Sequence, residues 1–90
     1  MNRTIITVVG KDTVGIIAAV CTYLAEHHVN ILDISQTIVQ EFFNMMMIVD
    51  LTQYDQTFDA LVADLHEVGE RMGVEVKCQR EEIFDKMHRI

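Results

Sequence analysis

The chain has 90 residues, of which 50% are hydrophobic and 23% are charged, and its seven basic and fourteen acidic residues give a net charge of −7. This length allows one small domain and excludes a two-domain enzyme, and the hydrophobic content excludes an intrinsically disordered chain. The negative charge repels polyanions, so we expect no nucleic-acid partner and no binding to anionic membranes.

The cysteines and the first residues of the chain bear on its location. Cys21 and Cys78 have no CxxC spacing, which is typical of buried apolar thiols in a reducing compartment. The apolar run between Thr4 and Gly10 is too short for a secretory signal or a membrane span. We therefore expect a cytoplasmic protein.

The first two expected elements are a strand and a helix. Residues 4–9 are rich in β-branched side chains, which predicts an interior strand. From Val14 the apolar spacing becomes helical, with Asp12 or Thr13 as the cap and an end near His28. The main apolar stripe of this helix should contain Ile17, Val20, Cys21, Leu24 and Ala25. A second, partly apolar stripe, available as a contact surface, should contain Ile16, Ala19, Tyr23 and His27.

Two strands should follow this helix. Residues 31–42 alternate between apolar and polar side chains, which predicts a long, half-buried strand. Residues 43–51 alternate too, and one face should carry Phe43, Met45, Met47, Val49 and Leu51. No glycine or proline marks the turn between the two strands, which we expect around Glu41 to Asn44.

A second helix, a strand and a short helix should complete the chain. Residues 58–72 have the clearest helical spacing, Gly73 should end that helix, and residues 74–78 alternate as a strand. The apolar stripe of the helix should contain Phe58, Leu61, Val62, Leu65, Val68 and Met72, and the residues facing away should be Asp59, Asp64, Glu67 and Glu70. Residues 80–90 predict a short C-terminal helix with an apolar side of Ile83, Phe84, Met87 and Ile90.

The order of elements predicts an α+β ferredoxin-like βαββαβ sandwich, in which a four-stranded antiparallel sheet carries two helices on one face. One domain should span residues 1–90, with a core of residues 3–79 and a C-terminal helix of residues 80–90. The central strands are apolar on both faces, so the face without helices would stay exposed in a monomer. The C-terminal helix, a second copy of the chain or both should cover it, and we expect a homodimer or a higher oligomer.

The loop between the first strand and the first helix has the groups needed to bind an amino acid. Gly10 and Gly15 allow unusual backbone dihedrals, and the free N–H groups at the start of a helix attract a carboxylate. Asp12 can bind an ammonium group, and Asn30 offers a hydrogen-bond donor and an acceptor. The alternative is that Asp12 only caps the helix and Asn30 only occupies a turn.

The sequence from the first strand through a D-x-x-G loop and a helix to the pair Asn30-Ile31 resembles the ACT domain over about residues 3–79. It is also similar to small stand-alone ACT proteins and to the ACT halves of glycine cleavage repressor proteins. The resemblance implies a regulatory module that binds an amino acid at a subunit interface. By the motif match, the polar positions of the site fall on Gly10, Asp12 and Asn30. With the rest of the loop, the expected ligand-binding residues are Gly10, Asp12, Val14, Gly15, Ile16 and Asn30. Gly10 stands where an amino-acid-binding ACT enzyme has histidine, and Val14 stands where many ACT loops have proline, so the identity of the ligand stays open.

The residues predict neither a metal site nor a catalytic site. No metal-ligand spacing links the four histidines, His27, His28, His66 and His88. In the run Met45-Met46-Met47, strand alternation sends the middle side chain to the opposite face, which indicates packing. The first loop has only Lys11 where an acylphosphatase needs arginine, and no Ser–His–Asp or Cys–His set can be assembled. We expect no metal, no cofactor and no enzyme activity.

Two hypotheses about function follow. The leading one is a small-molecule-sensing regulatory module that binds an amino acid or a similar metabolite at a homodimer interface. The alternative is a ligand-free oligomeric module that docks a partner protein through its apolar sheet face or its C-terminal helix.

Overall fold

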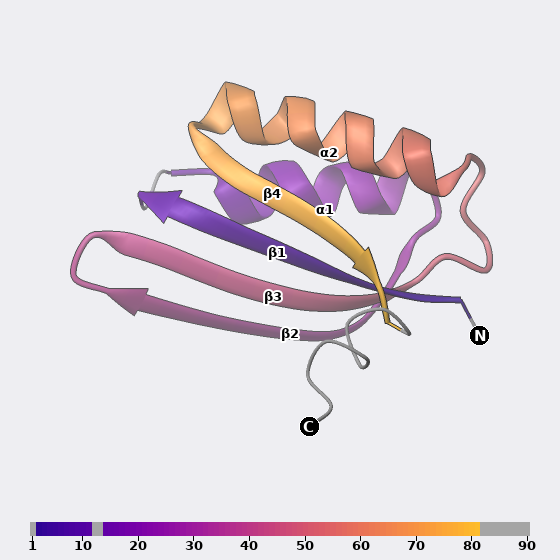
Figure 1. The fold of residues 1–90 in the computed structure, drawn as a ribbon, viewed down its shortest axis with the longest axis horizontal. Helices are drawn as coiled ribbons and strands as arrows, with labels where there is room; N and C mark the ends of the chain where they lie inside the picture. Colours follow the sequence, from indigo (N-terminus) through magenta and orange to yellow (C-terminus); the bar gives the residue numbers. More distant parts are fainter. Residues whose placement is uncertain (1, 12–13, 82–90) are drawn as a thin grey trace.

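The computed structural model describes residues 2–11 and 14–81, which form one sheet and two helices (Figure 1). The elements in chain order are β1 (Arg3–Lys11), α1 (Ile16–Glu26), β2 (Asn30–Val39), β3 (Phe42–Asp50), α2 (Phe58–Met72) and β4 (Val74–Arg80). The predicted βαββαβ order is confirmed. Residues 82–90, which include most of the expected C-terminal helix, lie outside the described residues.

Strands β1 and β3 form the centre of the sheet, and β2 and β4 form its edges. The strand order is β2-β3-β1-β4, and each neighbouring pair is antiparallel. Both helices lie on the same face of the sheet (Figure 1). The predicted interior position of the first strand is confirmed, because β1 pairs with β3 along one side and with β4 along the other.

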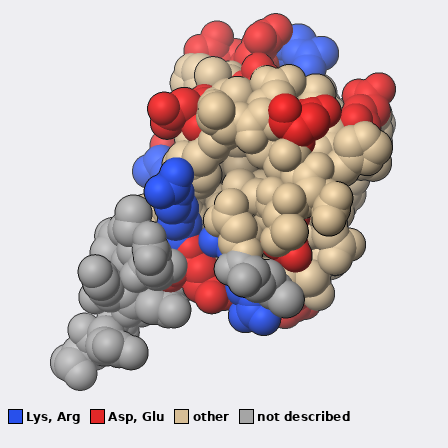
Figure 2. Space-filling view, turned by 90° about the vertical axis from the view of Figure 1, so that its right-hand side faces the viewer, with Lys and Arg blue, Asp and Glu red and all other residues tan. Residues whose placement is uncertain are grey.

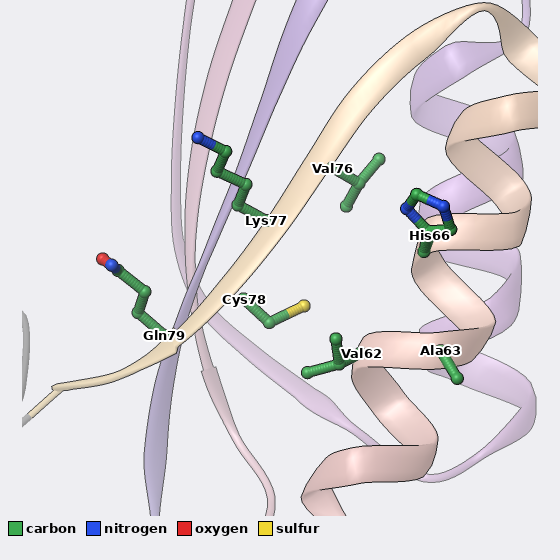
Figure 3. Close-up of a pocket in the computed structure, with 7 residues that line it drawn as sticks. All are labelled: Val62, Ala63, His66, Val76, Lys77, Cys78 and Gln79. Atoms are coloured by element: carbon green, nitrogen blue, oxygen red, sulfur yellow. The ribbon is translucent and has the colours of Figure 1, made fainter.

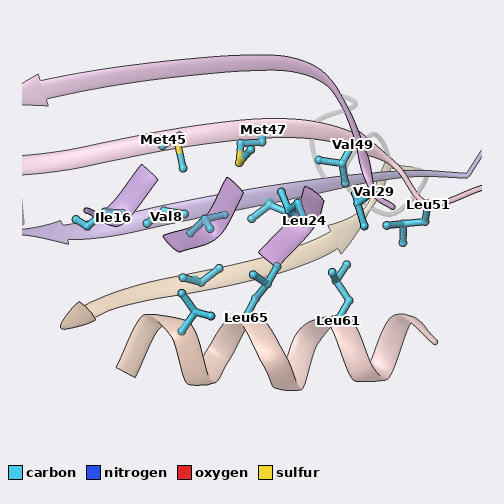
Figure 4. Packing of buried hydrophobic residues seen from close by; sticks show 14 of the residues in the cluster. Val8, Ile16, Leu24, Val29, Met45, Met47, Val49, Leu51, Leu61 and Leu65 are labelled. Atoms are coloured by element: carbon cyan, nitrogen blue, oxygen red, sulfur yellow. The ribbon is translucent and has the colours of Figure 1, made fainter. Parts of the chain in front are cut away.

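The hydrophobic core fills the space between the sheet and the helices (Figure 4). Met45, Met47 and Val49 on β3 are fully buried, as the alternation of residues 43–51 predicted. Leu61 and Leu65 on α2 are fully buried too. Burial of one such side chain stabilises the fold by about 1.5–3 kcal/mol, so this layer holds the helices on one face of the sheet.

Helix α1 buries a stripe that differs in part from the one that the sequence indicated. Ile16, Val20 and Leu24, each four residues apart, face the core, whereas Ile17 is 36% exposed and Ala25 is exposed. Two apolar stripes lie side by side in this segment, and periodicity alone does not choose between them. The choice depends on contacts with the rest of the fold, and the prediction was wrong for Ile17 and Ala25 but right for Val20 and Leu24.

Helix α2 has the predicted bounds, and Val62 is the one exposed member of its predicted apolar stripe. Thr57 is its N-cap and accepts a hydrogen bond from the Ala60 N–H at 3.2 Å, and Gly73 ends it with φ 73°. Gly69 lets the helix approach β4, because a Cβ atom at this position would lie 2.7 Å from the Val74 carbonyl oxygen. Among the described residues, neither helix is long and apolar enough to cross a membrane.

Asp64 does not face solvent as the helical pattern of α2 suggested. Its carboxylate accepts a hydrogen bond of 2.5 Å from the Tyr23 hydroxyl, which lies 2.8 Å from the Tyr54 hydroxyl. This contact joins α1 to α2 and to the loop that precedes α2. The polar side of α2 therefore contributes to the packing of the two helices.

Strand β2 is more exposed than its alternating sequence suggested. From Leu32 to Val39 every residue is exposed, although a half-buried strand was expected. Ile34 and Ile38 pair with Met47 and Phe43 of the buried face, yet they stay 43% and 53% exposed at the uncovered edge. The turn to β3 lies at residues 40–41, slightly before its expected position.

Candidate functional site

Gly10 lies near the end of β1, between Phe43 on β3 and Val74 on β4. A Cβ atom on Gly10 would lie 2.8 Å from Val74 Cγ1, which is closer than side chains tolerate. Packing therefore explains why this position has no side chain. A contribution of Gly10 to a ligand site would come from its backbone.

The N-terminus of α1 offers backbone N–H groups at the same end of the sheet. Gly15 is the N-cap, with φ 91° in the left-handed region that favours glycine, and no described side chain caps the helix. Ile16 is 2% exposed and belongs to the core, whereas Val14 is 97% exposed. Asp12, which we predicted to bind an ammonium group, lies outside the described residues. The N–H groups of the first turn are suited to a carboxylate.

Asn30 lies at the opposite end of the sheet from this loop. It is the first residue of β2 and pairs with Asp50, which in turn pairs with Arg3 at the start of β1. Gly10, by contrast, lies near the end of β1. Within one chain the structure thus brings Gly10, Gly15 and Ile16 to one end and leaves Asn30 at the other.

A hollow of about 350 Å³ surrounds Asn30, and His28, Val29 and Gln53 complete its lining. Figure 2 looks onto this end of the molecule, where acidic side chains gather around the helices and a broad uncharged surface lies below them. The sequence did not single out His28 or Gln53 as ligand residues. The sequence feature that could have drawn attention to His28 is its position directly after the end of a helix, where glycine is the usual residue.

Two polar groups outside the lining of the hollow are engaged in hydrogen bonds of their own. The Thr52 hydroxyl and N–H donate hydrogen bonds of 2.7 and 3.0 Å to Asp50, and these bonds lower the pKa of its carboxyl. Burial and the hydrogen bond to Asp64 raise the pKa of Tyr23 above its ordinary value. Both groups stabilise the fold locally, which makes them poor candidates for ligand binding.

Next to these groups, His27 contacts the loop before α2. Its Nδ1 atom lies 3.1 Å from Asp55 Oδ1, and its ring lies 4.4 Å from the Tyr23 ring, measured between centroids. The contacts tie the end of α1 to residues that follow β3. They hold the chain segment that leads into His28 and Asn30.

A second, apolar groove of about 450 Å³ runs between α2 and β4 (Figure 3). Val62, Ala63 and His66 line its helical side, and Cys78 lies on the strand side. Burial raises the pKa of the Cys78 thiol to about 12, so the thiol is protonated at neutral pH and is a poor nucleophile. Within residues 2–11 and 14–81, no cluster of His, Cys, Asp and Glu could hold a metal ion.

Comparisons with known proteins agree with this fold. The ACT domain family model matches residues 2–79. A UPF0237 protein of Bifidobacterium longum is 64% identical over 90 residues, which cover all of both chains. An ACT domain protein from Streptococcus pneumoniae has a TM-score of 0.81 and 40% identity, covering 93% of this chain and 94% of that one.

A more distant similarity extends to a structure assigned as a glycine cleavage system transcriptional repressor. It has a TM-score of 0.74 and 20% identity, and the match covers 88% of this chain and 45% of that one, so it supports the fold alone. ACT domains are regulatory domains that sense small molecules and are generally not enzymes. The match over residues 2–79 and the close relative show that the chain belongs to the ACT domain family.

Proposed function

We propose that this chain is a regulatory module that binds an amino acid or a similar metabolite at the interface of a homodimer. It acts without a catalytic step, in the cytoplasm. The observation that carries the proposal is the separation of its site residues, with the N-terminus of α1 at one end of the sheet and Asn30 at the other. A second copy of the chain can bring the two halves together.

The edge of β2 is the surface that suits a second copy. Leu32, Ile34, Ile38 and Val39 are exposed apolar residues on this ten-residue strand, and Asp33 is its one charged residue. An exposed, apolar edge strand readily pairs with another strand. The other edge of the sheet is protected, because β4 carries Glu75 and Lys77, which form a 3.2 Å ion pair.

Antiparallel pairing of two β2 strands would assemble a shared site. Under twofold symmetry the second β2 runs in the opposite direction, so the partner's Asn30 comes to the end of the sheet where the loop of the first copy lies. The N–H groups that follow Gly15 would bind the ligand carboxylate, and Asp12 would bind its ammonium group. Asn30 of the partner subunit would hydrogen-bond to the ligand from across the interface.

The face of the sheet opposite α1 and α2 favours the second candidate, a ligand-free interaction module. Val9, Phe42 and Met46 on this part of the sheet are 48%, 51% and 39% exposed. An apolar face of this kind can dock a partner protein. Absence of any bound metabolite would leave this second function as the better one.

Titration calorimetry with the twenty amino acids tests the proposal. We expect at least one to bind the native protein, and we expect Asn30→Ala to weaken that binding by about 1–3 kcal/mol because the ligand loses a hydrogen-bond partner. Asn44→Ala is the matched control, since Asn44 is also exposed but lies within β3. Binding of no amino acid, or equal weakening by the two variants, would contradict the proposal.

A further inference from the structure

Helix α1 ends on a residue in an unusual backbone conformation. His28 has φ 62°, in the left-handed region that side chains with a Cβ atom rarely adopt. The His28 N–H donates to the Ala25 carbonyl at 3.3 Å, and the Val29 N–H donates to the Leu24 carbonyl at 2.9 Å. These two bonds form a Schellman ending, in which the left-handed position usually belongs to glycine.

Helix α2 shows the usual solution in the same molecule. It ends on Gly73 with φ 73°, and the Gly73 N–H donates to the Glu70 carbonyl at 3.3 Å. Glycine adopts this conformation without steric conflict, so a histidine at the corresponding position of α1 is the less stable choice for the fold. A residue kept in a strained conformation points to a use for its side chain.

The surroundings of His28 indicate what that use is. Its side chain lines the hollow together with Asn30 and Gln53, so the polar groups there are one imidazole and two carboxamides. None of the residues that line the hollow is a carboxylate, a lysine or an arginine. The carbonyl end of α1 lies beside it, and the negative end of a helix dipole disfavours a bound anion.

These groups both donate and accept hydrogen bonds, and a neutral carboxamide is their closest chemical match. A carboxamide side chain offers two donors and an acceptor oxygen. A carboxylate side chain would offer acceptors alone, and an aliphatic side chain would leave the polar groups of the lining without hydrogen-bond partners. The volume of about 350 Å³ has room for such a side chain.

We propose that His28 and Gln53, together with Asn30, form the subsite for the side chain of the ligand and select an amino acid with a carboxamide side chain. This inference rests on the proposed function, because it places the side chain of the proposed amino-acid ligand. It assigns a binding role to two residues that lie outside the loop motif.

The test is titration calorimetry of the native protein and His28→Gly with glutamine, glutamate and leucine, which have similar size and differ in side-chain chemistry. We expect the native protein to bind glutamine in preference to the other two, and His28→Gly to bind glutamine about tenfold more weakly or worse. Its melting temperature should stay equal or rise, because glycine relieves the backbone conformation.

His66→Gln is the control, since His66 lies on α2 and pairs with Glu70 at 2.8 Å; it should bind glutamine like the native protein. If the native protein binds glutamine and His28→Gly binds it equally well, the subsite is wrong while the shared site stands. Equal binding of leucine or glutamate would overturn the choice of a carboxamide. If the native protein binds no amino acid at all, the proposed function itself fails.

Discussion

Thr4 on β1 is a single polar side chain in an apolar layer. It is fully buried, and its Oγ1 atom has no hydrogen-bond partner among residues 2–11 and 14–81. Burial of an unpaired hydroxyl lowers stability, because the group loses its hydrogen bonds to water without gaining others. The hydroxyl of Thr4 therefore lowers the stability of the fold.

Replacement of this hydroxyl should stabilise the protein. We expect Thr4→Val to raise the free energy of unfolding by about 1 kcal/mol, since valine has the same shape without the unpaired hydroxyl. Thr7→Val on the same strand, where Thr7 is partly exposed, should have a smaller effect. Urea unfolding of both variants is the measurement, and a clear loss of stability in Thr4→Val would contradict the absence of a partner.

Two residues of the candidate site have properties that the sequence alone does not show. The sequence marks Gly10 as special but does not give the reason, which is the 2.8 Å approach of Val74 from another strand. His28 resembles any exposed histidine until the end of α1 is located, because its left-handed conformation depends on where the helix stops. Both properties arise from backbone geometry.

At the level of elements, helix α2 provides the clearest test of the core. Leu65 is fully buried in the centre of its apolar stripe, whereas Glu67 is exposed two residues later. We expect Leu65→Ala to lower the free energy of unfolding by about 2–5 kcal/mol, because it leaves a cavity. Glu67→Ala should change it by less than about 0.5 kcal/mol. Denaturant unfolding that gives equal losses would mean that α2 packs through another face.

The two helices show why one element was predictable and the other was not. The apolar residues of α2 form one stripe that ends at Gly73, so its periodicity specifies its buried face. Helix α1 carries two neighbouring apolar stripes, and its rotation depends on contacts such as the hydrogen bond between Tyr23 and Asp64. The same contact explains why Asp64 does not face solvent. The periodicity of a sequence reports on the faces of a single helix, whereas these contacts form between two helices and are not visible in it.

For the whole molecule, the exposed edge of β2 is the feature with the largest consequence. A single charge placed on it should prevent pairing with a second copy, because a buried lysine without a partner is unfavourable. We expect the native protein to sediment as a dimer and Ile34→Lys as a monomer. Val62→Lys is the control, since Val62 is similarly exposed but lies on α2. A native monomer, or a dimer that survives Ile34→Lys, would contradict this interface.

The sequence predicted the order of the elements and the sheet, because strand alternation and helical spacing are local. It did not predict that Asn30 lies at the far end of the sheet from Gly10, since that distance follows from the direction of β2. The motif residues look like one group in the sequence, but in the folded chain they lie at two opposite ends of the sheet. Pairing of two chains is the arrangement that would reunite them.

The most direct measurement of the central claim is complementation between two variants that each damage a different half-site. Asp12→Ala removes the partner proposed for the ammonium group, and Asn30→Ala removes the contact proposed from the opposite subunit. An equal mixture of the two, exchanged at random, contains mixed dimers in about half of its molecules, each with one intact and one doubly damaged site. Calorimetry with the amino acid that binds the native protein should detect about a quarter of the native number of sites at native affinity, although neither variant alone reaches that affinity. A mixture that binds no better than its two parents would show that the site is not shared between subunits.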